Sequence, residues 1–247
     1  MKKTLVALAC VGYLISPFAS ADTLGVYIGG GQWKLDPSGG ISKGPDTIDL
    51  NTDLGLSKES QNNYYVALEH PVPGLPNIKL QRQDLSLAAT NVLTRTIDYG
   101  GQTFVVNDTV TSDLDLGYQD IILYYEILDN WVSVDVGVNI KNFDGSISIS
   151  SSTDSVDDSL SEYVPMLYGR AKFEIPSTNF LLDFEASVIS YSGDSFSDLR
   201  AAVGYESDVG LGAELGYKRI QLNIDNLSGI TSDLTFDGYY FDINFHF

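Results

Sequence analysis

The chain is poor in several residue types on which many binding proteins and enzymes depend. Its 247 residues include one cysteine and two histidines, and 14 lysines and arginines stand against 33 acidic residues, a formal net charge of −19. The single cysteine, Cys10, lies in an N-terminal segment that we expect to be removed, which leaves no disulfide and no thiolate metal site. The shortage of basic residues argues against nucleic acid as a partner, because contacts to phosphate need lysine and arginine.

Long apolar runs and the motifs of common enzymes are also missing. No run reaches the length of a membrane helix, so a membrane-spanning chain with this sequence would have to cross as strands. The sequence has no GxSxG, no HExxH and no phosphate-binding loop. We therefore expect no catalysis, no cofactor and no metal site.

The N-terminal segment has the three parts of a secretory signal peptide. Lys2 and Lys3 supply positive charge, residues 4–18 are largely apolar, and Ala19-Ser20-Ala21 is a small-x-small cleavage site. We expect residues 1–21 to be cleaved and residues 22–247 to form a single domain. A lipoprotein with Cys10 lipidated is the alternative, but almost no apolar region precedes this cysteine.

Apolar and polar residues alternate along most of the remaining chain. From Val132 to Ile140 every second residue is apolar, which indicates a strand, since a helix has a period of 3.6 residues. The end of the chain repeats this alternation. Its apolar positions are Tyr239, Phe241, Ile243, Phe245 and Phe247.

The alternation predicts ten strands. Long polar connections such as 36–59 and 143–161 take turns with short ones such as Asp129-Asn130, an arrangement typical of outer-membrane barrels. We therefore predict an all-β fold, a transmembrane antiparallel up-and-down β-barrel with short periplasmic turns and longer extracellular loops. Eight strands is the alternative count, if residues 78–128 form one long protruding hairpin. A β-bulge is possible near residues 121–125. The expected strands are 24–35, 60–70, 78–98, 103–128, 131–142, 162–175, 180–191, 198–206, 211–224 and 234–247.

With its signal peptide, Gly29-Gly30 and aromatic terminal strand, the chain resembles small Gram-negative outer-membrane β-barrel proteins, in particular the short-chain family with a Gly-Gly pair in the first strand. The resemblance implies an outer-membrane location among lipid and lipopolysaccharide. It also implies periplasmic chaperones and a barrel-assembly machinery that reads the strand from Tyr239 to Phe247 as an assembly signal. We expect a monomer. Families of this kind are mostly without an assigned activity.

The polar face of the predicted strands carries charges of both signs. In a ten-stranded barrel these side chains would face a narrow lumen, neutralise one another and fill it. The lumen candidates are Asp135, Lys141, Arg170, Lys172, Glu174, Asp183, Glu185, Arg200, Glu206, Glu214 and Lys218.

Three functions remain open at this point. The first is a non-enzymatic barrel that supports the envelope or binds a ligand through its loops. The second is a narrow channel, with Arg170, Lys172 and Arg200 facing Asp183 and Glu185 at a constriction. The third is a hydrolase. It is disfavoured because the two histidines that it would need, His70 and His246, are expected at the periplasmic rim.

Two predicted loops are rich in acidic residues and have two interpretations. Such loops could bind divalent cations, but no EF-hand spacing is present and a solvated extracellular loop is favoured. The clusters are Asp46, Asp49, Asp53 and Glu59 in the first loop, and Asp154, Asp157, Asp158 and Glu162 in the later one.

Overall fold

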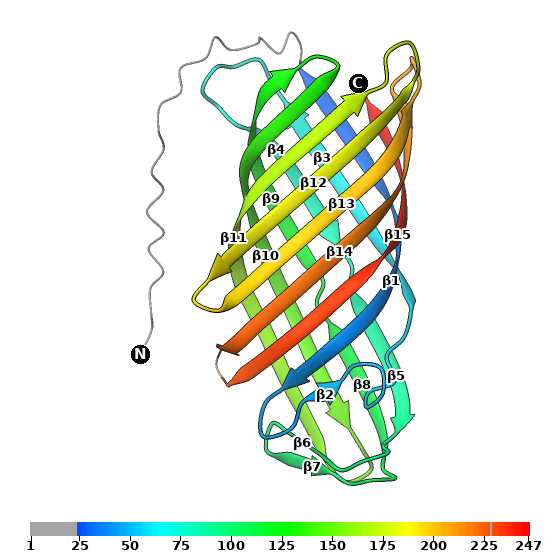
Figure 1. Ribbon diagram of the computed structural model, residues 1–247, viewed down its shortest axis with the longest axis vertical. Coiled ribbons are helices and arrows are strands. Elements are labelled where there is room, and N and C mark those ends of the chain that lie inside the picture. The colour runs from blue at the N-terminus through cyan, green and yellow to red at the C-terminus, as the bar shows by residue number, and fades with distance from the viewer. Residues whose placement is uncertain (1–23, 228) are drawn as a thin grey trace.

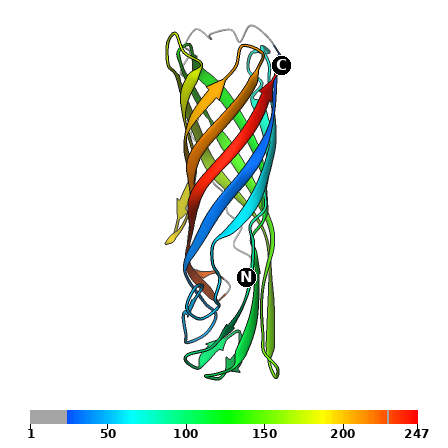
Figure 2. The same ribbon diagram turned by 90° about the vertical axis from the view of Figure 1, so that its right-hand side faces the viewer.

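In the computed structural model, which describes residues 24–227 and 229–247, the chain forms an antiparallel sheet that closes on itself (Figures 1 and 2). The predicted ten-stranded β-barrel is confirmed and the eight-stranded alternative is wrong. In order around the barrel, the strands are β1 (Gly25–Ser42), β3 (Glu59–Glu69), β4 (Asn77–Gln83), β9 (Tyr118–Asp129), β10 (Val132–Ser150), β11 (Ser155–Glu174), β12 (Phe180–Tyr191), β13 (Asp194–Glu206), β14 (Leu211–Leu227) and β15 (Ile230–His246). The ring closes where β10 pairs with β11.

Five shorter strands lie at the end of the barrel that carries the long connections. They are β2 (Ile48–Asp49), β5 (Ser86–Val92), β6 (Ile97–Tyr99), β7 (Gln102–Phe104) and β8 (Thr109–Asp115). β5 pairs with β8, and β8 pairs with the far end of β10, so this region extends the barrel wall (Figure 1). We call the segments 36–58, 84–117 and 143–162 together the head.

The other end of the barrel has short turns, as predicted. His70 to Pro76, Asn130 and Trp131, and Ser207 to Gly210 link neighbouring strands there. The backbone N–H of Val26 donates to the carbonyl of Phe247 at 2.9 Å, which joins the first and last barrel strands at this end. No helix in the described part of the chain is long and apolar enough to cross a membrane. The predicted signal peptide lies outside the described residues.

The structure corrects several details of the predicted strands. The predicted strand 78–98 is divided into β4 and β5, and the predicted strand 103–128 is divided into β7, β8 and β9. Residues 143–161 are not a polar loop, because β10 and β11 continue through them as a paired hairpin whose turn is 151–154. Pairing is continuous over residues 121–125. The bulge lies instead at Ile127, which has no partner where Leu128 pairs with Val134 and Glu126 pairs with Asp135.

The two faces of the strands exchange character along the barrel. On β10, Val136 and Val138 face outward and are exposed, whereas Asp135 and Lys141 face inward and are buried. Beyond Lys141 the inward positions become apolar, with Phe143, Ile147 and Ile149 buried, and the outward ones become polar.

This exchange has a simple physical cause. Where hydrocarbon surrounds a barrel, apolar side chains face out and polar ones face in, whereas water outside favours the reverse arrangement. The outward apolar stretch of β15, Tyr239 to Phe247, has nine residues and spans roughly 23 Å at the usual rise and tilt, close to the apolar band of outer-membrane barrels.

Candidate functional site

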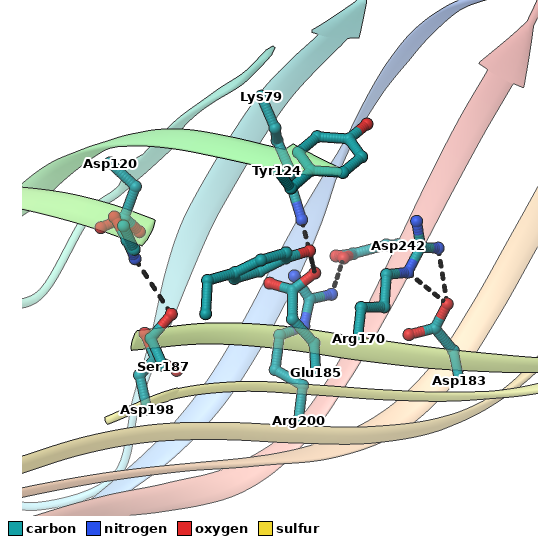
Figure 3. Close-up of polar contacts among 12 residues, drawn as sticks. Lys79, Asp120, Tyr124, Arg170, Asp183, Glu185, Ser187, Asp198, Arg200 and Asp242 are labelled. Carbon is teal, nitrogen blue, oxygen red and sulfur yellow. Dashed lines mark hydrogen bonds and ion pairs between the residues drawn. The ribbon is translucent and has the colours of Figure 1, made fainter. Parts of the chain in front are cut away.

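The central lumen holds three ion pairs between side chains of different strands, all of them buried or half-buried (Figure 3). Lys79 Nζ lies 2.7 Å from Glu185, and Arg200 lies 2.5 Å from Asp242. Arg170 donates from both Nε and a terminal nitrogen to Asp183, at 2.9 and 2.5 Å. A carboxylate in a low-dielectric interior needs such a charged partner, so these pairs remove the cost of unpaired charge in the lumen.

A second cluster lies one level closer to the head and is centred on Lys141. Its ammonium group is 2.8 Å from Asp120 and 3.1 Å from Asp198, and it lies over the ring of Tyr118. Lys218 donates to the Tyr118 hydroxyl at 2.9 Å, which in turn donates to Asp198 at 2.8 Å. Both lysines are almost fully buried, so each ammonium group depends on this network.

On the side of this cluster that faces the head, the interior of the barrel becomes apolar. Trp33 and Met166 are buried, and Phe143 lies between Tyr118 and Phe196 with ring centroids 5.6 and 5.5 Å apart. This apolar layer is continuous with the core of the head. The head residues in the same core include Leu50, Leu54, Ile97, Tyr99, Phe104, Val110, Leu114 and Ile149.

Most of the predicted lumen residues lie inside the barrel. Arg170 faces Asp183 as expected, but the other partners differ from those expected. Arg200 pairs with Asp242, and Glu185 pairs with Lys79, rather than with each other. Lys172 pairs with the more exposed Glu174 at 3.2 Å. Asp135 and Glu214 line a cavity, and their side chains make no hydrogen bond or ion pair with the described residues. The remaining predicted residues lie in three places. Lys141 and Lys218 belong to the cluster centred on Lys141, and Arg170 and Asp183 pair with each other. Glu206 lies at the short-turn mouth of the barrel.

Sequence reasoning missed four residues that complete the lumen network: Lys79, Asp120, Asp198 and Asp242. Lys79 lies between Ile78 and Leu80 in a strand whose polar face was not followed. The ambiguous phase around Ile121 and Ile122 concealed that Asp120 faces inward. Asp242 lies on the polar face of the strand from Tyr239 to Phe247, whereas the predicted assembly signal uses only the apolar face of that strand.

The glycines of the first strand make room for lumen side chains. A Cβ at Gly29 would overlap the ring of Tyr65, and one at Gly31 would overlap Asp242 and the backbone of Phe241. A larger residue at Gly31 would displace the Asp242 carboxylate that pairs with Arg200, and a larger residue at Gly29 would displace Tyr65.

The acidic residues of the head hold its loops together. Arg95 donates to Asp53 at 2.6 Å, and this hydrogen bond raises the pKa of the Arg95 guanidinium. Burial alone would raise the pKa of Asp49, but hydrogen bonds from Thr52 and Asn51 hold that pKa below its usual range. Asp158 forms an ion pair with Lys43. Among residues 24–227 and 229–247, no three His, Cys, Asp or Glu side chains are grouped closely enough to hold a metal ion.

Both histidines lie at the short-turn end. His70 accepts a hydrogen bond from the N–H of Val72 and lies 3.2 Å from the carbonyl of Pro76, within one turn. His246 stacks on Tyr27 with a centroid distance of 4.1 Å. Each ring thus has a local structural partner.

Comparison with known proteins identifies the fold. No family model and no curated protein matches the chain. The outer membrane protease OmpT from Escherichia coli superimposes with a TM-score of 0.55 and 9% identity over 94% of this chain and 99% of that chain. The transport unit of the autotransporter AIDA-I from Escherichia coli gives 0.40 and 9% over 95% and 92%, and a Pseudomonas aeruginosa FadL homologue gives 0.35 and 9% over 92% and 90%. The chain therefore has the fold of outer-membrane β-barrels.

Proposed function

We propose that this protein is a closed, non-enzymatic outer-membrane barrel that holds a rigid acidic head beyond the outer leaflet for binding or envelope support. The observation that carries the proposal is the continuous apolar core shared by the head and the part of the lumen nearest to it. Because Trp33, Phe143 and Phe196 belong to it, the barrel wall and the head form one packed unit.

Location and partners are part of the same proposal. A cleaved signal peptide, assembly from the terminal strand and an environment of lipid and lipopolysaccharide would bring a monomer into the outer membrane. The resemblance to the short-chain family, carried by Gly29-Gly30, supports this.

The channel alternative differs in what closes the lumen. If the ion pairs at Arg170 and Lys172 formed the constriction, removing both side chains would open a path. If the barrel is closed as we propose, the path stays blocked, because the apolar layer around Phe143 lies between these ion pairs and the head.

Planar bilayers test this difference. The wild-type protein and the Arg170→Ala/Lys172→Ala variant should both give negligible current, in bilayers where a general porin conducts. A stepwise rise in current for the double variant would favour the channel and overturn the closed-barrel proposal.

OmpT shares the fold, but that likeness alone does not extend to activity. A hydrolase that depended on histidine would need His70 or His246, and both lie at the end away from the head. We propose that the chain has no protease activity. Cleavage of a casein or peptide panel that is lost in His70→Ala or His246→Ala would contradict this.

A further inference from the structure

A polar cavity of about 210 Å³ occupies the short-turn half of the lumen, and the ion-pair residues Lys79, Glu185, Arg170, Asp183 and Arg200 form part of its wall. Its wall includes residues at the ends of strands, among them Gly25, Asp129 and Glu206, so it reaches the short-turn mouth. The apolar layer closes the lumen on the other side. The cavity is therefore a cup with one entrance.

The charges that line this cup do not balance. Eight carboxylates line it against four lysines and arginines. Each of those four cations is already within 4 Å of a carboxylate: Lys79 of Glu185, Arg170 of Asp183, Lys172 of Glu174 and Arg200 of Asp242. Of the remaining carboxylates, Glu206 lies 3.7 Å from His246, and Glu69, Glu126, Asp129, Asp135 and Glu214 form no ion pair within the described chain.

Asp135 shows the imbalance most clearly. It is only 5% exposed and lines the cavity, yet its side chain forms no hydrogen bond or ion pair with the described residues. Its cross-strand partner on β11 is Arg170, whose guanidinium donates to Asp183 and makes no hydrogen bond or ion pair with Asp135. Its partner on β9 is Glu126, another acid that lines the cavity, and like charges directly opposite each other destabilise a sheet. A buried carboxylate in this position needs a positive partner.

The bulge at Ile127 increases the negative charge. It lets Ile127 and Leu128 both face outward, where they are exposed, while Glu126 and Asp129 both line the cavity. Regular pairing would turn one of these acids towards lipid. Bulges often redirect side chains at functional sites, and this one directs two carboxylates to the same wall as Asp135.

Aromatic rings separate these carboxylates. Tyr27, Tyr65, Tyr124, Tyr168 and Tyr240 line the cavity, and the Tyr124 hydroxyl donates to Glu69 at 2.8 Å. Aromatic faces attract ammonium groups, and an aromatic wall with carboxylates is a recognised environment for organic cations. Since the carboxylates lie on several strands, a ligand of several atoms fits them better than a single ion.

We propose that this cup binds a small organic ammonium ion that enters from the short-turn mouth, with Asp135 as the principal counter-charge and Glu126 and Glu69 beside it. The proposal is independent of the closed-barrel function, because a ligand in the cup need not pass the apolar layer.

Isothermal titration of the full-length mature protein in detergent micelles, with putrescine and choline as probes, tests the proposal. At constant ionic strength, we expect saturable binding of at least one probe. Asp135→Asn, which keeps the side chain's shape, should weaken it at least about tenfold. Asp144→Asn is the matched control, because Asp144 is on the same strand, is exposed and does not line the cavity. Faster gel migration without heating shows that each variant is folded.

Tyr65→Leu gives a second test, because it removes an aromatic wall and leaves every carboxylate in place. We expect it to weaken choline binding. Three results would overturn the proposal: no saturable binding of either probe at millimolar concentration, equal affinity in Asp135→Asn and wild type, or binding of Ca²⁺ that neither amine displaces.

Discussion

Lys141 and Phe143 occupy successive inward positions on β10, yet Lys141 belongs to a buried ion cluster and Phe143 to the apolar core. Between these two residues the outside of the barrel changes from apolar to polar. We interpret this level as the outer edge of the membrane, because hydrocarbon outside and water outside demand opposite faces of the same strand.

The first prediction concerns the lipid-facing side of β10. Val136→Arg should lower the free energy of unfolding by about 2–4 kcal/mol, because the arginine would face hydrocarbon. Ser146→Arg, on the outward face of the same strand beyond Lys141, should change it by no more than about 0.5 kcal/mol. Urea unfolding in lipid vesicles measures both. Equal costs at the two positions would show that the membrane edge is misplaced.

The second prediction concerns the ion cluster. Lys141→Met should destabilise the barrel by about 3–5 kcal/mol, because Asp120 and Asp198 would lose the ammonium group between them. Lys58→Met breaks an exposed pair with Asp36 and should cost at most about 1 kcal/mol. The same unfolding measurement compares them. A Lys141 variant as stable as the Lys58 control would mean that the cluster is not needed.

The third prediction concerns the head. Phe104 is fully buried in its core, and Phe104→Ala should cost about 3–5 kcal/mol of local stability. Proteases added outside cells should then cleave the head, while the barrel keeps its faster migration on unheated gels. Val105→Ala, at an exposed neighbouring position, should stay resistant. Loss of the folded barrel in the Phe104 variant would mean that the head does not fold on a preformed barrel.

The fourth prediction concerns assembly. Phe247→Ala should reduce the protein in the outer-membrane fraction and leave material in the periplasm, because the terminal strand is the proposed assembly signal. Phe180→Ala removes another exposed aromatic residue at the same end of the barrel, outside the terminal strand. Fractionation should show normal assembly for it. Equal losses for both variants would point to a general need for aromatic residues at this rim.

The sequence was sufficient to predict the barrel strands because each membrane-crossing segment has one lipid face. Val132 to Ile140 and Tyr239 to Phe247 show this alternation without interruption. The continuation of β10 and β11 into the head was not predicted, because the pattern changes phase at Lys141. The apolar residues Phe143, Ile147 and Ile149 are at odd-numbered positions, whereas the preceding valines are at even-numbered ones. The continuation of β10 therefore has the pattern of a polar loop in the sequence.

The ion pairs were only partly predictable for a different reason. Alternation shows which side chains point into the lumen, but the partner of each depends on how the strands are staggered around the closed barrel. Arg200 and Asp242 are two strands apart and 42 residues apart in sequence, and nothing local marks them as partners. The meeting of Trp33, Phe143 and Phe196 in the apolar layer also depends on how the strands are staggered, so it could not be predicted from the sequence.

The central claim is that the outer edge of the membrane lies between Lys141 and Phe143 on β10. The accessibility of spin labels placed along this strand to oxygen and to a water-soluble reagent tests it most directly. Residues 22–247 contain no cysteine, so in a protein of these residues single cysteines at positions 132–148 can each carry a spin label in lipid vesicles, with oxygen and a water-soluble nickel chelate as relaxing agents. We predict that even-numbered positions from 134 to 140 are exposed to oxygen in lipid, and that those from 144 to 148 are exposed to the chelate in water. Oxygen-rich, chelate-protected positions that continue to residue 148 would contradict the account.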